Sequence, residues 1–384
     1  KRQAMASSTD LSEDGLARLC EQAVAMARAA SEDPWCGLAD EGTLAKTIPD
    51  LDIAAAGEPT PEWLQDQAAK AEDAARAVKG VTNSEGAEAG WSRSHVALAT
   101  SGGFRGAYAG THYGASTSVI AGTGTAMQTD YDFTAATHAD GLADAAAIGR
   151  NAGERAVRRL NPRKAATARV PVVFENRLAG RLLRALAGAI AGPSIARGTS
   201  FLKGAMGTAL FPSSVTIVDD PHRRRGLRSK PFDGEGVANS RRAIIDGGVL
   251  TTWLLDSASA RQLGLATTGH ASRGTSSPPS PSPTNFYMEP GPQSFAELIA
   301  DIHQGLLVTE LMGMGVNGVT GDYSQGAAGF WIENGEVAYP VSEITIASNL
   351  KDMYRGLTAA SDLVFRSGMD APALRIEAMT VAGK

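Results

Sequence analysis

Residues 198–291 constrain the fold of this chain more than any other stretch, because glycine-containing turns recur through them at short intervals. Glycine adopts the backbone conformations that tight turns need, so frequent glycines divide a chain into short segments. We therefore expect strands to dominate the second half. The turn-bearing segments are Gly198-Thr199-Ser200-Phe201-Leu202, Asp219-Asp220, Arg225-Gly226, Phe232-Asp233-Gly234-Glu235-Gly236, Asp246-Gly247-Gly248 and Thr284-Asn285-Phe286-Tyr287-Met288-Glu289-Pro290-Gly291.

Further signals define individual elements of the second half. Asn334-Gly335 favours a type I′ turn between two strands, and Asp246-Gly247 predicts a similar hairpin. Ser294 with Glu297 forms a capping box, which predicts the start of a helix. The expected elements are a strand over 170–174, a helix over 182–190, hairpins over 243–255 and 330–341, an exposed Ser/Pro-rich loop over 275–284 and a closing strand over 374–380.

The first half carries helix signals on both sides of a strand pattern. Asp10 is the expected N-cap of the first helix, and Thr60 followed by Pro61 predicts the start of the second. Between the second and third helices, apolar and polar residues alternate, which predicts antiparallel strands. Pro162 stops the third helix. The expected elements are helices over 11–29, 61–80 and 142–160 and a strand meander over 81–133.

Together these elements predict an α+β protein in two parts. Residues 1–168 form an N-terminal and central α+β domain with helices and antiparallel strands, and residues 169–384 form a β-rich C-terminal domain. A length of 384 residues is enough for more than one domain with its own core. We also expect residues upstream of Lys1, because the chain begins without Met and within a predicted strand.

The order of the turn segments in residues 198–291 resembles the C-terminal half of the TldD/PmbA family, named for a maturation peptidase and for modulators of DNA gyrase. In that family one subunit carries a metal-binding His-Glu-x-x-x-His helix. Its partner, of the PmbA or TldE type, has the same scaffold without the motif. The resemblance spans nearly the whole chain and implies a TldD-like catalytic subunit, which supplies zinc and forms a heterodimer with this chain.

The resemblance places the metal motif directly after Leu182 and Leu183. In this chain the positions of ligand, general base and ligand hold Arg184, Ala185 and Ala189. A divalent metal needs imidazole or carboxylate donors that converge on one point, and neither arginine nor alanine supplies them. The six histidines include no pair at i, i+4 spacing. We therefore predict that this chain has no metal ligand, no catalytic residue and no cofactor of its own.

A glycine-bracketed loop holds the histidine most suggestive of binding, His270. Loops of this kind often carry binding residues, although a surface histidine bonded to its own loop is the simpler interpretation. In the family this part of the chain lies near a peptide-binding cleft. The resemblance therefore implies that Arg273 and Asn285 contact a peptide, and the loop position makes His270 a further candidate for a peptide contact.

Charge argues against a nucleic-acid partner. The formal net charge is −5 and the pI about 5.8, whereas phosphate binding requires clustered Lys and Arg. Residues 222–225, with Arg228 and Lys230, form a short basic run that could dock an acidic partner. Such runs are more often solvated loop charge. Asp219 and Asp220 are expected to make ion pairs or cap turns rather than to bind a metal.

Cysteine content and hydropathy predict a cytoplasmic location. Cys20 and Cys36 are too few for a disulfide framework, and we expect both to be reduced and partly buried. No apolar run has the length of a membrane span, and no signal peptide is evident, so we expect no membrane association.

The resulting hypothesis is a non-catalytic, peptide-holding subunit of a TldD/TldE-like metallopeptidase that processes unfolded or modified peptides. Two alternatives remain open at the level of sequence. One is a self-sufficient homodimeric peptidase with a site built from His270, Glu289 or Asp322. The other is a regulatory binding protein without a proteolytic role. Homodimerisation is compatible with each of these hypotheses.

Overall fold

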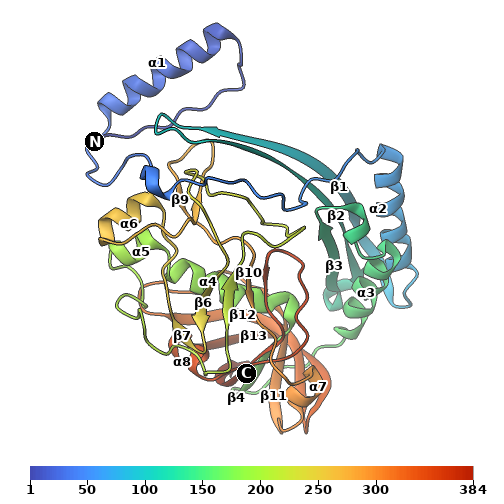
Figure 1. Ribbon diagram of the computed structural model, residues 1–384. Helices are drawn as coiled ribbons and strands as arrows, with labels where there is room; N and C mark the ends of the chain where they lie inside the picture. Colours follow the sequence, from blue (N-terminus) through green and yellow to red (C-terminus); the bar gives the residue numbers. More distant parts are fainter. Residues whose placement is uncertain (384) are drawn as a thin grey trace.

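A long antiparallel hairpin dominates the first half of the molecule and arches over the second half (Figure 1). The structure, a computed structural model, describes residues 1–383. Strands β1 (Val81–Ala99) and β2 (Arg105–Ala121) pair along their full length, and β3 (Gln128–Ala136) pairs with β2. The order β1-β2-β3 confirms the predicted meander and places β1 at an edge of the sheet.

Two helices, α2 (Pro61–Arg76) and α3 (Ala145–Arg158), pack on each other and on this sheet. A Cβ at Gly149 of α3 would lie 2.1 Å from the carbonyl oxygen of Ala71, so only glycine permits such a close helix crossing. The predicted cap of α2 is confirmed, because the Thr60 side chain accepts a hydrogen bond from the Trp63 amide. The helix ends at Arg76, before the predicted stop.

Helix α1 (Glu13–Ala29) lies away from the body of the molecule (Figure 1). Its N-cap is Ser12 rather than the predicted Asp10, whose carboxylate instead accepts from the Ser12 amide. The apolar side of α1 stays exposed, and Cys20 is exposed as well, whereas Cys36 is buried. The predicted partial burial of both thiols is therefore wrong. Residues 1–8 form no strand, contrary to expectation.

The C-terminal domain is built on a six-stranded sheet of order β13-β12-β11-β4-β16-β14, in which an additional β13–β16 pairing closes the sheet on itself. Helix α4 (Asn176–Ala189) buries its leucine face, including Leu182, Leu183 and Leu186, in the main core. The strands are β4 (Ala168–Phe174), β11 (Gln304–Met312), β12 (Asp322–Glu333), β13 (Glu336–Asn349), β14 (Leu357–Ala359) and β16 (Leu374–Ala382).

A second sheet, of order β15-β10-β5-β6-β7, lies on the other side of α4. The sheets and helices together confirm the predicted α+β class. The strands of this sheet are β5 (Ile217–Asp219), β6 (Arg242–Asp246), β7 (Val249–Leu250), β10 (Phe286–Met288) and β15 (Met369–Asp370); the remaining elements are β8 (Ala271–Ser272), β9 (Ser280–Pro281), α5 (Gly192–Ala196), α6 (Ser257–Leu263), α7 (Phe295–Ile299) and α8 (Leu350–Arg355).

The predicted turns are confirmed with one shift. Asn334 and Gly335 both have positive φ, 50° and 81°, as a type I′ turn between β12 and β13 requires. In the β6–β7 hairpin Asp246 pairs with Val249, so the turn consists of two glycines and begins one residue later than predicted. The Ser294–Glu297 capping box starts α7 as expected.

Candidate functional site

Helix α4 carries the three positions at which the resemblance places metal ligands and a general base. Arg184 is exposed, Ala185 is half-buried and Ala189 is buried. None of the three side chains has an imidazole or carboxylate donor, so the residues present do not fit a divalent metal. Within residues 1–383, no group of three or more His, Cys, Asp or Glu side chains is arranged to hold one.

Two arginines, Arg184 of α4 and Arg228 of a neighbouring loop, place positive charge at these positions instead. Arg228 is half-buried, and its side-chain carbons cover Gly368, where a Cβ would lie 2.4 Å from Arg228 Cγ. Burial and then the charge of Arg184 lower the pKa of Arg228, while Asp219 and Asp370 act in the opposite direction. Two neighbouring guanidinium groups repel a divalent cation rather than attract one.

His270 is buried, with 2% of its surface exposed, so the expectation of a surface histidine is wrong. Its Nδ1 lies 2.7 Å from Thr268 Oγ1, and its Nε2 lies 3.2 Å from Asp219 Oδ2. The same carboxylate accepts hydrogen bonds from the amide and hydroxyl of Thr284. Both ring nitrogens thus have protein partners, and His270 holds its loop against β5 instead of offering a contact to a peptide. Asp219 has the structural role that the sequence predicted.

Asn285 is equally buried and also has a structural role in place of the predicted peptide contact. Its Nδ2 donates to the Asp220 carbonyl and to Ser229 Oγ, each at 2.7 Å. Its Oδ1 accepts from the Arg228 amide at 3.0 Å. With these bonds the side chain fixes both ends of the basic loop, because a buried amide needs partners for its donors and its acceptor.

Arg273 is the remaining predicted peptide contact, and it is exposed. Its Nε donates to the carbonyl of Gly234 at 2.9 Å, which anchors the guanidinium group at the edge of a cavity. The residues of the self-sufficient alternative do not converge. Glu289 pairs with Arg241 at 3.1 Å, Asp322 is bonded to Thr320 and Asn349, and His270 is bonded to Thr268 and Asp219, so the three share no partner.

The basic run is largely solvated, as expected, and its exposed arginines also join different parts of the chain. Arg225 pairs with Asp52 at 2.8 Å and with Asp140 at 3.1 Å, which connects the loop to the N-terminal segment and the central domain. The Arg223 guanidinium lies 3.4 Å from the centre of the Phe365 ring. The sequence showed the cluster of charge but not the acidic partners, which are distant in sequence.

Three cavities lie between the β1–β3 sheet and loops of the C-terminal domain. The largest, of about 740 Å³, is lined by Trp91, His112 and Phe133 from the sheet and by Leu227 and Arg366 from the other side. A second, of about 220 Å³, shares Leu227 with it. The third, of about 330 Å³, lies at the far end of the hairpin and is lined by Tyr108, Lys230 and Arg273, among others.

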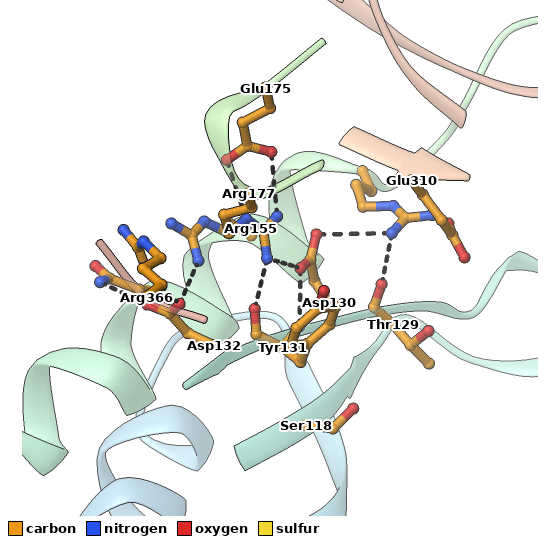
Figure 2. A network of polar contacts seen from close by, with 12 residues as sticks. Ser118, Thr129, Asp130, Tyr131, Asp132, Arg155, Glu175, Arg177, Glu310 and Arg366 are labelled. Atoms are coloured by element: carbon orange, nitrogen blue, oxygen red, sulfur yellow. Dashed lines mark hydrogen bonds and ion pairs between the residues drawn. The ribbon is translucent and has the colours of Figure 1, made fainter. Parts of the chain in front are cut away.

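A buried polar network joins the central sheet to the C-terminal domain, and we call it the junction network (Figure 2). Asp130 of β3 lies 3.2 Å from Arg177 of α4, and Asp132 lies 3.1 Å from Arg155 of α3. Burial alone would lower the pKa of Arg177, but the charges of Glu175 and Asp130 raise it. The network consists of Asp130, Asp132, Arg155, Arg159, Glu175, Arg177, Glu310 and Arg366.

Comparison with known proteins agrees with this fold. Models of the PmbA/TldA metallopeptidase central and C-terminal domains match residues 55–160 and 167–383. Metalloprotease PmbA of Escherichia coli O157:H7 is 42% identical over 100% of this chain and 84% of its own length. This chain therefore belongs to the PmbA/TldD metallopeptidase family.

Two solved structures share the architecture. A protein from Bacteroides thetaiotaomicron, named as a candidate modulator of DNA gyrase, matches with a TM-score of 0.91 and 28% identity over 100% of this chain and 86% of its own. TldE from Thermococcus kodakarensis matches with a TM-score of 0.86 at 24% identity over 98% and 86%, and at this identity the likeness concerns the fold. Among residues 1–383, no helix combines the length and the apolar character of a membrane span.

Proposed function

We propose that this chain is the non-catalytic, peptide-holding subunit of a two-component metallopeptidase, paired in the cytoplasm with a TldD-like subunit that supplies the zinc. One observation carries the proposal. The scaffold of a metallopeptidase family is present, yet α4 presents Arg184, Ala185 and Ala189 where metal chemistry needs donors. A chain of this kind contributes shape and contacts to the reaction, and its partner contributes the Lewis acid.

The cavities between the hairpin sheet and the C-terminal domain support a role in holding a peptide. Strand β1 lies at a sheet edge, where an extended peptide can be bound through main-chain hydrogen bonds. Arg273 is exposed and lines the cavity at the hairpin's far end, so we propose it as a peptide contact. His270 and Asn285 are left out because their polar atoms are already bonded within the chain.

Co-expression with a TldD-like subunit tests the proposal. The complex is purified by a tag on this chain alone, and zinc content and peptide hydrolysis are measured for each chain separately and for the pair. We expect zinc and chelator-sensitive hydrolysis only when the partner is present. A matched variant, Arg184→Ala, should leave the zinc content of the complex unchanged, because this side chain is not a ligand.

Stoichiometric zinc and hydrolysis by this chain alone would overturn the proposal in favour of a self-sufficient homodimeric peptidase. Failure to recover a TldD-like partner, with peptide binding also absent, would instead favour a regulatory binding protein. The zinc measurement separates these outcomes, because it does not depend on the choice of peptide.

A further inference from the structure

The cavity at the far end of the β1–β2 hairpin combines apolar walls with polar groups that have few partners in the chain. The hairpin contributes Val96, Leu98 and Tyr108, and the opposite wall contributes Phe232. The ring centres of Phe232 and Tyr108 lie 5.3 Å apart in an edge-to-face contact, which joins the hairpin to the C-terminal domain. Figure 1 shows this hairpin reaching over that domain.

Two basic side chains line the same cavity, Lys230 and Arg273. Within residues 1–383, no hydrogen bond or ion pair engages the Lys230 ammonium, and Arg273 donates only through Nε, to the Gly234 carbonyl. Burial lowers the pKa of Lys230, Asp233 and Asp219 oppose this effect, and Arg228 adds to it. An ammonium group that is removed from water without a hydrogen-bond partner is destabilised, so an anion that enters the cavity would be bound strongly.

Asp233 is the one acidic residue in the lining, and its carboxylate is already engaged. Its Oδ1 accepts from the amides of Glu235 and Val237, each at 2.8 Å, and its Oδ2 accepts from the Ala271 amide at 3.1 Å. These bonds hold the loop in shape but leave the Lys230 ammonium without a direct contact. Tyr108 also lines the cavity, and burial raises the pKa of its hydroxyl, which therefore stays a neutral donor.

We propose that this cavity, the carboxylate cavity, binds the free C-terminal carboxylate of a peptide whose last side chain is apolar. The proposal rests on the peptide-holding function. Lys230 and Arg273 supply charge-assisted hydrogen bonds to the carboxylate oxygens, and Tyr108 supplies a further donor. Val96, Leu98 and Phe232 surround the side chain. A volume of about 330 Å³ suits the end of a peptide rather than a long segment.

Calorimetric titration of the purified full chain tests this with an N-acetylated peptide that ends in leucine. The peptide is compared as the free acid, as the C-terminal amide, and as an amide with a glutamate inside its sequence. We expect the free acid to bind about tenfold more tightly than either amide, because neither amide has a charged carboxylate at its C-terminal end. Arg273→Gln and Lys230→Met should each weaken free-acid binding about tenfold and leave amide binding unchanged. Lys203→Gln, which removes an exposed lysine that does not line this cavity, is the matched control.

Equal binding of free acid and amide would overturn the proposal while leaving the peptide-holding function intact. Tight binding of the internal-glutamate amide would assign the cavity to acidic side chains instead of the chain end. Binding of none of the peptides would overturn both this proposal and the peptide-holding role. Because Arg273 is exposed, its variant provides a result even if Lys230→Met fails to fold.

Discussion

The junction network and the carboxylate cavity both contain basic side chains removed from water, but they differ in what those side chains contact. In the junction network, Arg177 has 2% of its side chain exposed and lies 3.2 Å from Asp130. In the carboxylate cavity, the Lys230 ammonium has no such contact within residues 1–383. Paired buried charge fixes the relation between two domains, whereas unpaired charge weakens the fold and favours a ligand.

Removal of an acid from the junction network should have the largest effect on stability. Asp130→Ala leaves Arg177 and Arg159 without that partner, and loss of one partner of a buried pair typically costs about 3–5 kcal/mol. Urea unfolding followed by circular dichroism measures the change. Asp66→Ala, which removes an exposed partner of Lys70, is the control, and we expect an effect below about 1 kcal/mol. Equal costs at the two positions would show that the junction network does not join the domains as described.

Removal of the unpaired charge from the carboxylate cavity should stabilise the protein, whereas removal of Asp130 should destabilise it. Lys230→Met retains much of the side chain's volume and removes a desolvated ammonium, so the free energy of unfolding at pH 7 should increase by about 1 kcal/mol. The same substitution at exposed Lys203 should change stability by less than about 0.5 kcal/mol. A loss of stability for Lys230→Met would mean that the ammonium has a stabilising partner in the folded chain.

The advantage of Lys230→Met should depend on pH. The pKa of Lys230 is lowered in the folded chain, so as pH rises the folded state loses this proton before the unfolded state does, and the original protein gains stability. The difference in free energy of unfolding between Lys230→Met and the original protein should therefore shrink as pH rises from the lowered pKa toward the ordinary lysine value of 10.5. Unfolding curves at several pH values measure it. A difference independent of pH would indicate a packing effect.

Arg273→Gln should have the smallest effect on stability, within about 0.5 kcal/mol, because the side chain is exposed and makes one hydrogen bond to Gly234. The denaturation midpoint measures this. Arg197→Gln, at another exposed arginine, serves as the comparison. A large loss for Arg273→Gln alone would make this residue part of the structural framework and not of a ligand site.

The sequence predicted local structure where a backbone conformation or a cap decides it. Thr60 and Ser294 begin their helices as expected, since their hydroxyls satisfy amides within the next turn. Asn334-Gly335 forms the predicted turn because both residues tolerate positive φ. Each of these signals acts over a few residues, so no knowledge of the rest of the chain is needed.

The same reasoning failed where the surroundings of a side chain decide its role. Leu16 of α1 and Leu186 of α4 belong to similar apolar helix faces, yet Leu16 is 44% exposed and Leu186 is fully buried. His270 and Asn285 lie in polar, glycine-rich segments and are nevertheless buried. Periodicity shows which face of an element is apolar, but it does not show which element covers that face.

Residue identity and local pattern were enough to predict the α+β class, the caps at Thr60 and Ser294, the hairpin turn at Asn334 and the absence of imidazole and carboxylate donors at Arg184, Ala185 and Ala189. Those properties depend on residue identity and on neighbours along the chain. The tertiary structure alone decided that Asp130 meets Arg177 and that Lys230 shares a cavity with Tyr108 and Arg273. Such contacts join residues far apart in sequence, and their energies depend on burial and distance, which only the folded arrangement specifies.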